Sequence, residues 1–136
     1  MKILVDTSVW SLLLHRKKQP VHPAALFLRD KIETGAPLYI TGVIRQEILQ
    51  GVRSETQLNK LKNYLSDFDS LEATSVVHEK AAVLFNRCRE KGVSAHTIDC
   101  LIATLAMHHN YFLLTTDDDF QNIARCSPVE LKIVNF

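Results

Sequence analysis

The sequence predicts an α/β layer sandwich, in which helices cover both faces of a mainly parallel sheet. Short apolar runs with β-branched residues alternate along the chain with longer amphipathic segments. The short runs are continuously apolar, as expected of strands that are buried on both faces. Because strands separated by helices pair in parallel through right-handed crossovers, this alternation favours a three-layer α/β/α arrangement.

The first half of the chain contains two predicted strands and three predicted helices. Each strand is a short apolar run, and the helices are bounded by capping residues, a proline or glycines. The predicted strands span residues 3–5 and 38–40, and the predicted helices span residues 9–14, 24–34 and 43–50.

In the second half, apolar residues recur at helical spacing in three segments and form strand-like runs in three others. The predicted helices cover residues 58–68, 77–88 and 98–106, and the predicted strands cover residues 71–74, 112–114 and 131–134.

The size and composition indicate a single domain. The chain has 136 residues, of which 46% are hydrophobic and 23% charged, so neither disorder nor a fibrous protein is expected. Its 16 basic and 15 acidic residues give a net charge of +1, which by itself does not indicate nucleic-acid binding. No repeat or linker marks a boundary, and we expect one domain over residues 1–136.

The cysteines and the N-terminus predict a cytoplasmic protein without a membrane segment. Cys88, Cys100 and Cys126 are far apart in the sequence and lie in or beside apolar segments, which predicts buried, reduced thiols. The apolar N-terminal run is interrupted by Asp6, and no signal-peptide cleavage site follows it. No apolar stretch is long enough to cross a bilayer.

Two acidic residues come directly after predicted strands. Asp6 follows the first strand, and Asp117 follows the apolar run that begins at Phe112. Ligands of open parallel sheets collect at the carboxyl ends of the strands, which is where both residues are expected. Helix capping would also explain Asp6, and Asp117 could cap the short helix that follows it. Capping alone is the better explanation for Asp118 or Asp119.

Two further acids lie on predicted helices. Glu47 comes three residues after Ile44 and therefore shares its core-facing side, where an unpaired carboxylate is costly. Pairing with Arg45 or Arg53 is the alternative explanation for Glu47. Asp99 lies near the start of its helix, where the helix dipole alone would also favour an acid.

The joint occurrence of these acids carries more weight than any one of them. The four acids are Asp6, Glu47, Asp99 and Asp117. Gathered at one sheet edge, they would raise one another's pKa unless a cation neutralised them. An all-oxygen set without His or Cys favours Mg²⁺ or Mn²⁺ over zinc, and such ions activate water and stabilise charge on a phosphate. The sequence leaves open whether one or two ions bind.

Four short motifs contain these acids and are spread over nearly the whole chain. They are V-D-T-S at 5–8, I-R-Q-E-I-L-Q-G at 44–51, T-I-D-C-L-I-A at 97–103 and L-L-T-T-D-D-D-F at 113–120. Each motif is weak alone, but the ordered set resembles the PIN-domain ribonucleases, specifically the VapC-type toxins of bacterial toxin–antitoxin pairs. Cys100 stands where many of these proteins have Ala, which leaves the motif intact.

The resemblance implies a role for each matching residue. The positions that match the family's metal-binding acids are Asp6, Glu47, Asp99 and Asp117, with Asp119 at the position of an acid that sometimes joins them. The positions that match its supporting hydroxyls are Thr7 or Ser8, and Thr115. The resemblance further implies a five-stranded sheet, a homodimer, a cognate antitoxin, and hydrolysis of single-stranded or looped RNA by a metal-activated water.

Basic residues are candidates for binding the RNA backbone, because phosphate contacts supply affinity without sequence choice. A solvated helix face is the simpler explanation for any one of them. The candidates are Arg16, Lys17, Lys18, Arg45 and Arg53, followed by Arg87, Arg89 and Lys91.

Two alternative functions remain open from the sequence. A phosphotransfer domain also places acids at a sheet edge, but a haloacid-dehalogenase-like member needs D-x-D after the first strand, where this chain has Asp6, Thr7 and Ser8. A receiver domain needs an acceptor Asp after the third strand and a Lys after the fifth, and no segment supplies both. The other alternative is a non-catalytic PIN-like module that binds RNA or protein, against which the complete set of acids argues.

Overall fold

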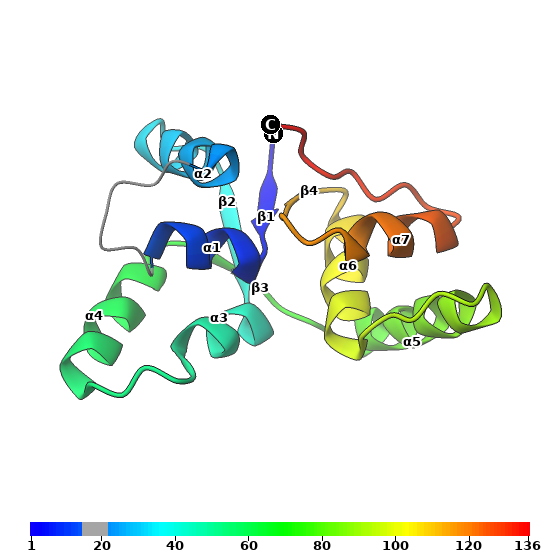
Figure 1. Ribbon diagram of the computed structural model, residues 1–136. Helices are drawn as coiled ribbons and strands as arrows, with labels where there is room; N and C mark the ends of the chain where they lie inside the picture. The colour runs from blue at the N-terminus through cyan, green and yellow to red at the C-terminus, as the bar shows by residue number, and fades with distance from the viewer. Residues whose placement is uncertain (15–21) are drawn as a thin grey trace.

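A computed structural model describes residues 1–14 and 22–136 and confirms the predicted α/β fold (Figure 1). Four parallel strands form one sheet in the order β3-β2-β1-β4. The strands are β1 (Ile3–Val5), β2 (Leu38–Thr41), β3 (Asp69–Leu71) and β4 (Phe112–Leu114).

Two groups of helices enclose the sheet. Figure 1 shows α1 to α4 on one side and α5 to α7 on the other, which gives the expected α/β/α layers. The helices are α1 (Thr7–Leu14), α2 (Pro23–Glu33), α3 (Gly42–Leu49), α4 (Glu55–Leu65), α5 (Ser75–Glu90), α6 (Thr97–His109) and α7 (Asp119–Cys126).

The central strand β1 fixes the position of the first acid. Ile3 pairs with both Leu38 and Phe112, so that β1 lies between β2 and β4. All three β1 side chains are fully buried, as their continuous apolar run predicts. The next residue is Asp6, whose backbone N–H donates to the Leu114 carbonyl at 2.9 Å. Asp6 therefore lies at the carboxyl edge of the sheet, next to the end of β4.

Two strand predictions differ from the structure. β3 spans Asp69–Leu71, so it begins two residues and ends three residues earlier than expected. Thr74, predicted as the last strand residue, instead caps α5, where its hydroxyl accepts from the Val77 N–H. The predicted strand at 131–134 is only an isolated parallel bridge between Ile133 and Leu113. The sheet in the described residues thus has four strands instead of five. Burial of Leu131 and Val134 against the core explains why this segment has the apolar pattern of a strand.

The cysteines lie where their apolar surroundings predict. Cys88 on α5, Cys100 on α6 and Cys126 on α7 are all free and buried. Burial raises the pKa of the Cys88 thiol to about 12, and the neighbouring Cys126 and Cys100 thiols add to this effect. At neutral pH this thiol is therefore protonated and a poor nucleophile. Within residues 1–14 and 22–136, no helix has the length and apolar character to cross a membrane.

Candidate metal centre

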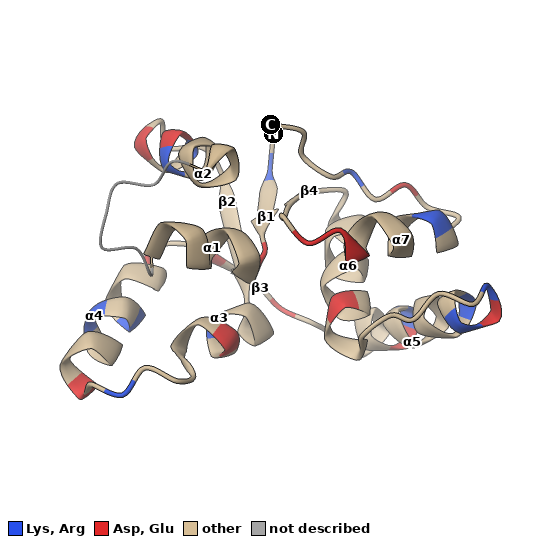
Figure 2. Ribbon diagram, viewed as in Figure 1, with Lys and Arg blue, Asp and Glu red and all other residues tan. Residues whose placement is uncertain are grey.

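The acidic residues of interest lie around the carboxyl edge of the sheet. Figure 2 shows them at the end of β1, on α3, at the start of α6 and in the loop before α7. Parallel strands end together at this edge, which brings segments from the two halves of the chain to one place.

Asp6 is held by hydroxyl groups from two parts of the chain. Only 6% of its surface is exposed, and its Oδ2 accepts hydrogen bonds from Ser8 Oγ and Thr115 Oγ1, both at 2.8 Å. Its backbone carbonyl, not its carboxylate, accepts from the Val9 N–H at the start of α1. Helix capping therefore does not explain the Asp6 side chain. Its second carboxylate oxygen, Oδ1, accepts no hydrogen bond from a described residue.

Asp117 combines a local structural role with a place among the acids. Its N–H donates to Thr115 Oγ1 at 3.0 Å, and its Oδ1 accepts from the Asp119 N–H at 2.9 Å. This second bond satisfies a donor at the start of α7, as the capping alternative predicts. Asp118, the residue that precedes α7, makes no side-chain cap. Capping and a place beside the other acids are thus both features of Asp117.

Three carboxylates come close enough to share a cation. Asp99, Asp117 and Asp119 each offer an oxygen, and these oxygens all lie within 4.8 Å of one another. Magnesium binds oxygen ligands at about 2.0–2.1 Å and keeps several waters, so small side-chain movements would complete such a site. We call these three residues the acid triad. The donor set contains only oxygens and therefore fits Mg²⁺ or Mn²⁺.

The pKa of Asp99 shows that its charged form is disfavoured in this cluster of carboxylates. Its pKa is raised to about 6, first by burial and then by the negative charges of Asp117, Asp6 and Asp119. His96 opposes the shift. None of the side chains that shift the pKa of Asp99 is a Lys or Arg, so no basic side chain among these neighbours offsets the carboxylates around it. A bound cation would remove this repulsion between the carboxylates, as expected for acids gathered at one edge of the sheet.

Glu47 approaches the same region from α3. Its Oε1 accepts a hydrogen bond from Thr7 Oγ1 at 2.9 Å. Together with His96 and Asp99 it lines a hollow of about 400 Å³. Glu47 is not among the three closest carboxylates, but it lines this hollow together with Asp99.

The alternative explanation of Glu47 as an ion-pair residue is not supported. The guanidinium of Arg45 donates instead to Ser70 Oγ at 2.9 Å. Arg53 is exposed and forms no ion pair with Glu47. The hydrogen bond from Thr7 is the contact that holds Glu47, so its position reflects the site and not a helix-edge salt bridge.

The three predicted supporting hydroxyls all contact the acids. Thr7 bonds to Glu47, while Ser8 and Thr115 bond to Asp6 and lie 3.3 Å from each other. Ser8 Oγ also accepts from the Thr116 N–H at 3.1 Å, which ties the loop after β4 to α1. The structure thus brings the predicted acids and supporting hydroxyls together around this edge, although their roles in metal binding and catalysis stay predictions.

Removing the Thr115 hydroxyl tests this network. Thr115→Val takes one donor from Asp6 and the acceptor of the Asp117 N–H, so we expect a loss of about 1–2 kcal/mol in the free energy of unfolding. We also expect Mn²⁺ affinity to fall about tenfold, because groups that orient metal ligands have effects of this size. Denaturant unfolding and calorimetric Mn²⁺ titration measure both. Thr116→Val, which keeps its backbone hydrogen bond, is the matched control; equal Mn²⁺ affinity in the two variants would contradict the expectation.

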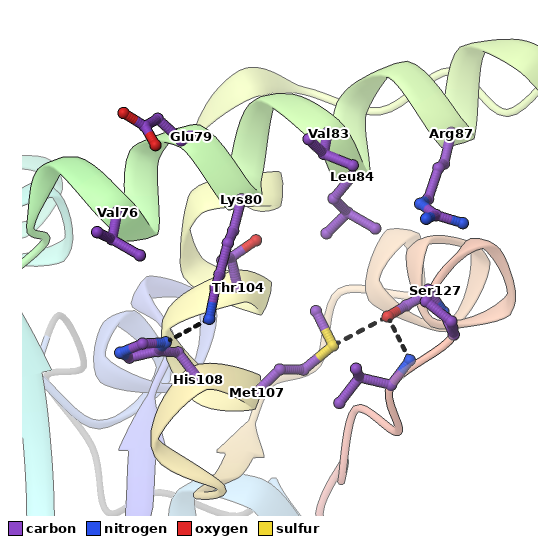
Figure 3. Close-up of a pocket in the computed structure, with 12 residues that line it drawn as sticks. Val76, Glu79, Lys80, Val83, Leu84, Arg87, Thr104, Met107, His108 and Ser127 are labelled. Atoms are coloured by element: carbon purple, nitrogen blue, oxygen red, sulfur yellow. Dashed lines mark hydrogen bonds between the residues drawn. The ribbon is translucent and has the colours of Figure 1, made fainter.

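The described basic residues that were predicted to bind RNA do not form one cluster as the acids do. Arg16, Lys17 and Lys18 lie outside the described residues. Arg87 on α5 lines a separate hollow of about 590 Å³, which is bounded by α5, α6 and the segment after α7 (Figure 3). Lys80 and His108 meet across this hollow at 3.1 Å, and none of the site acids lines it. Arg87 is therefore not a neighbour of the acid triad.

Comparison with known proteins decides the family. The model of the PIN domain matches residues 3–125. The chain belongs to the PIN-domain family. This match confirms the resemblance seen in the four sequence motifs. It argues against the alternative of a phosphotransfer domain.

Relatives of this PIN-domain chain cover almost its full length. Two of them, VapC ribonuclease Mb1587 of Mycobacterium bovis and ribonuclease VapC11 of Mycobacterium tuberculosis, are each 29% identical over 131 residues. These alignments cover 94% of this chain and 96% of each relative.

Solved structures share the fold. A chain of VapBC2 from Rickettsia felis has a TM-score of 0.75 at 17% identity, and the alignment covers 100% of this chain and 99% of that one. A chain of VapBC-1 from nontypeable Haemophilus influenzae has a TM-score of 0.77 at 15% identity, with coverage of 99% and 98%.

Proposed function

We propose that this PIN-domain protein is an Mg²⁺- or Mn²⁺-dependent endoribonuclease. The observation that carries the proposal is the convergence of acids from both halves of the chain at the carboxyl edge of the sheet, where the carboxylates of Asp117, Asp6 and Asp119 raise the pKa of Asp99. The names of the two mycobacterial relatives, both ribonucleases, support RNA as the substrate class.

The protein residues would divide the work as follows. Asp99, Asp117 and Asp119 hold the cation, with the hydroxyl-bonded Asp6 beside them. The cation supplies a water of lowered pKa and stabilises negative charge on the phosphate. Glu47, fixed through Oε1 by Thr7, keeps its Oε2 free to accept a proton from the attacking water across the hollow.

We further propose that the protein acts as the toxin of a toxin–antitoxin pair. Structures of similar fold include VapBC complexes and a toxin–antitoxin complex from Klebsiella pneumoniae. A structure of Mycobacterium tuberculosis VapC20, described as a sarcin-ricin loop cleaving toxin, has a TM-score of 0.64. On this basis the partners are a cognate antitoxin, a second copy of the chain in a homodimer, and single-stranded or looped RNA, in the cytoplasm.

The test is cleavage of defined RNA by the purified protein. We expect a fluorescent single-stranded RNA to be cut in Mg²⁺ or Mn²⁺, to stay intact in excess EDTA, and to be cut again once excess Mn²⁺ is restored. DNA of the same sequence and the fully paired RNA duplex are the substrate controls. Binding of the RNA without cleavage in Mn²⁺ would instead support a non-catalytic binding module.

A further inference from the structure

Two members of the acid triad line two different hollows, Asp99 one and Asp117 the other. One is the hollow of about 400 Å³ beside Glu47 and Asp99. The second, of about 370 Å³, is lined by Thr115–Asp118, by Gln121 on α7, by His22 and by residues 133–136. We call this second one the tail hollow. An RNA chain extends on both sides of any phosphate that is cut, so each hollow is a candidate place for a neighbouring nucleotide.

The tail hollow has an exposed aromatic ring at its wall. Phe136 is 51% exposed, and its ring contacts the ring of His22 edge to face, with centroids 6.2 Å apart. An aromatic ring of this kind, half open to solvent, is suited to stacking. Bases of single-stranded RNA bind proteins by stacking on such side chains.

Hydrogen-bonding side chains line the same hollow as this ring. The side-chain amides of Gln121 and Asn135 line the hollow, are exposed, and bond to no described residue. His22 Nδ1 accepts from the Ala24 N–H at 3.1 Å, so the proton of the neutral imidazole lies on Nε2, which remains a donor. Amides offer both donors and acceptors and can match the edge of a base.

The charge of the described residues that line the hollow favours an uncharged occupant over an anion. Asp117 and Asp118 both line it, and no Lys or Arg is among its described lining residues. A phosphate or carboxylate would be repelled there, whereas a planar, uncharged and polar group would not. A nucleobase has these properties, and the phosphate attached to its nucleotide would lie toward the cation at the acid triad.

We propose that the tail hollow binds the base of a nucleotide adjacent to the scissile phosphate, stacked on Phe136 and contacted by Gln121 and Asn135. The proposal rests on the ribonuclease function proposed above and names the part of the substrate that this side of the site selects. Phe136 is thereby a substrate-binding residue.

The test combines a protein variant with a series of RNAs. Wild-type protein and Phe136→Ala are assayed for kcat/KM on one single-stranded RNA and on versions with a single abasic nucleotide at each position. We expect wild type to lose about five- to a hundredfold at one position next to the cut, and Phe136→Ala to lose a similar factor on intact RNA. At that same position the abasic RNA should cost Phe136→Ala nothing further, because base and ring are already separated.

Controls distinguish this role from a structural one. Phe136→Trp keeps a stacking surface and should cut like wild type. Val129→Ala should also cut like wild type, because it shortens a side chain of similar exposure (56%) at the separate hollow of about 590 Å³ that Arg87 lines. Calorimetric Mn²⁺ affinity should be equal in wild type and Phe136→Ala. Weakened Mn²⁺ binding would show that the tail supports the acids instead and would overturn the proposal.

Two other outcomes separate this proposal from the proposed function. If wild type cuts RNA and Phe136→Ala cuts it equally well, or loses the same factor at every abasic position, the assignment of the tail hollow is wrong and the ribonuclease function stands. If wild type cuts no RNA in Mn²⁺, the proposed function is wrong and the base site is wrong with it.

Discussion

Asp99→Asn is expected to lower RNA cleavage by about 100-fold or more and to weaken Mn²⁺ binding at the same time. Asp99 contributes one of the three converging carboxylates, and an amide cannot supply the negative charge that the cation needs. Changes to residues that only orient metal ligands already cost about 10- to 100-fold, so loss of a ligand should cost at least as much. Single-turnover cleavage of a fluorescent RNA and calorimetric Mn²⁺ titration give the two measurements.

The same variant should not be less stable without metal. Burial and three neighbouring carboxylates disfavour the charged form of Asp99, and Asn carries no charge. The melting temperature of the metal-free variant near neutral pH should therefore equal or exceed that of wild type. Asp67→Asn, at an exposed position after α4, is the matched control and should cut RNA normally. Wild-type cleavage rates in Asp99→Asn would show that the metal site is assigned wrongly.

Mn²⁺ affinity is expected to fall steeply as the pH drops below about 6. The metal-free pKa of Asp99 is raised to about 6, so above this pH the carboxylate is ionised and below it protons compete with the cation. For a single competing proton the affinity falls about tenfold per pH unit. Calorimetric titrations at a series of pH values between about 5 and 8 would measure this slope. An affinity that does not change across this range would contradict the shifted pKa.

The stability of the metal-free protein should depend on pH in the opposite direction. The pKa of Asp99 is higher in the folded chain than its ordinary value of 3.8, so between these two values the folded state binds the proton more tightly. This group therefore adds stability as the pH falls from about 6 toward 4, and that contribution is lost as the pH rises through 6. Thermal melting in EDTA measures it, and Asp99→Asn should remove this part of the pH dependence.

Strand and helix positions followed largely from local sequence. The continuous apolar runs at 3–5, 38–40 and 112–114 are strands in the structure. Strands that are covered on both faces of a sheet consist mainly of apolar residues, so such runs predict them well. The run at 131–134 has the same composition but forms only one bridge with Leu113. A buried segment needs apolar side chains whether or not it pairs with a strand. Composition alone therefore did not distinguish this buried segment from a paired strand.

The identity of the candidate acids also followed from the sequence, because each stands where its charge is costly or where a strand ends. Sequence did not decide which of them would be closest. Asp119, only an optional member by resemblance, belongs to the acid triad, whereas Glu47 lines a hollow beside Asp99 and is not among the three closest carboxylates. Their separations depend on how α3, α6 and the loop before α7 pack, and such packing leaves no local pattern.

The sequence by itself determined the α/β fold, the family and the set of acids, since these depend on periodicity and on short motifs. The tertiary structure decided what each acid contacts. From the sequence, helix capping and metal binding explained Asp6 equally well. In the structure its carboxylate accepts a hydrogen bond from Thr115, 109 residues away, and it is the backbone carbonyl of Asp6 that accepts from the first turn of α1. A hydrogen bond between residues so far apart depends on the whole packed sheet, and only the folded chain brings the two groups together.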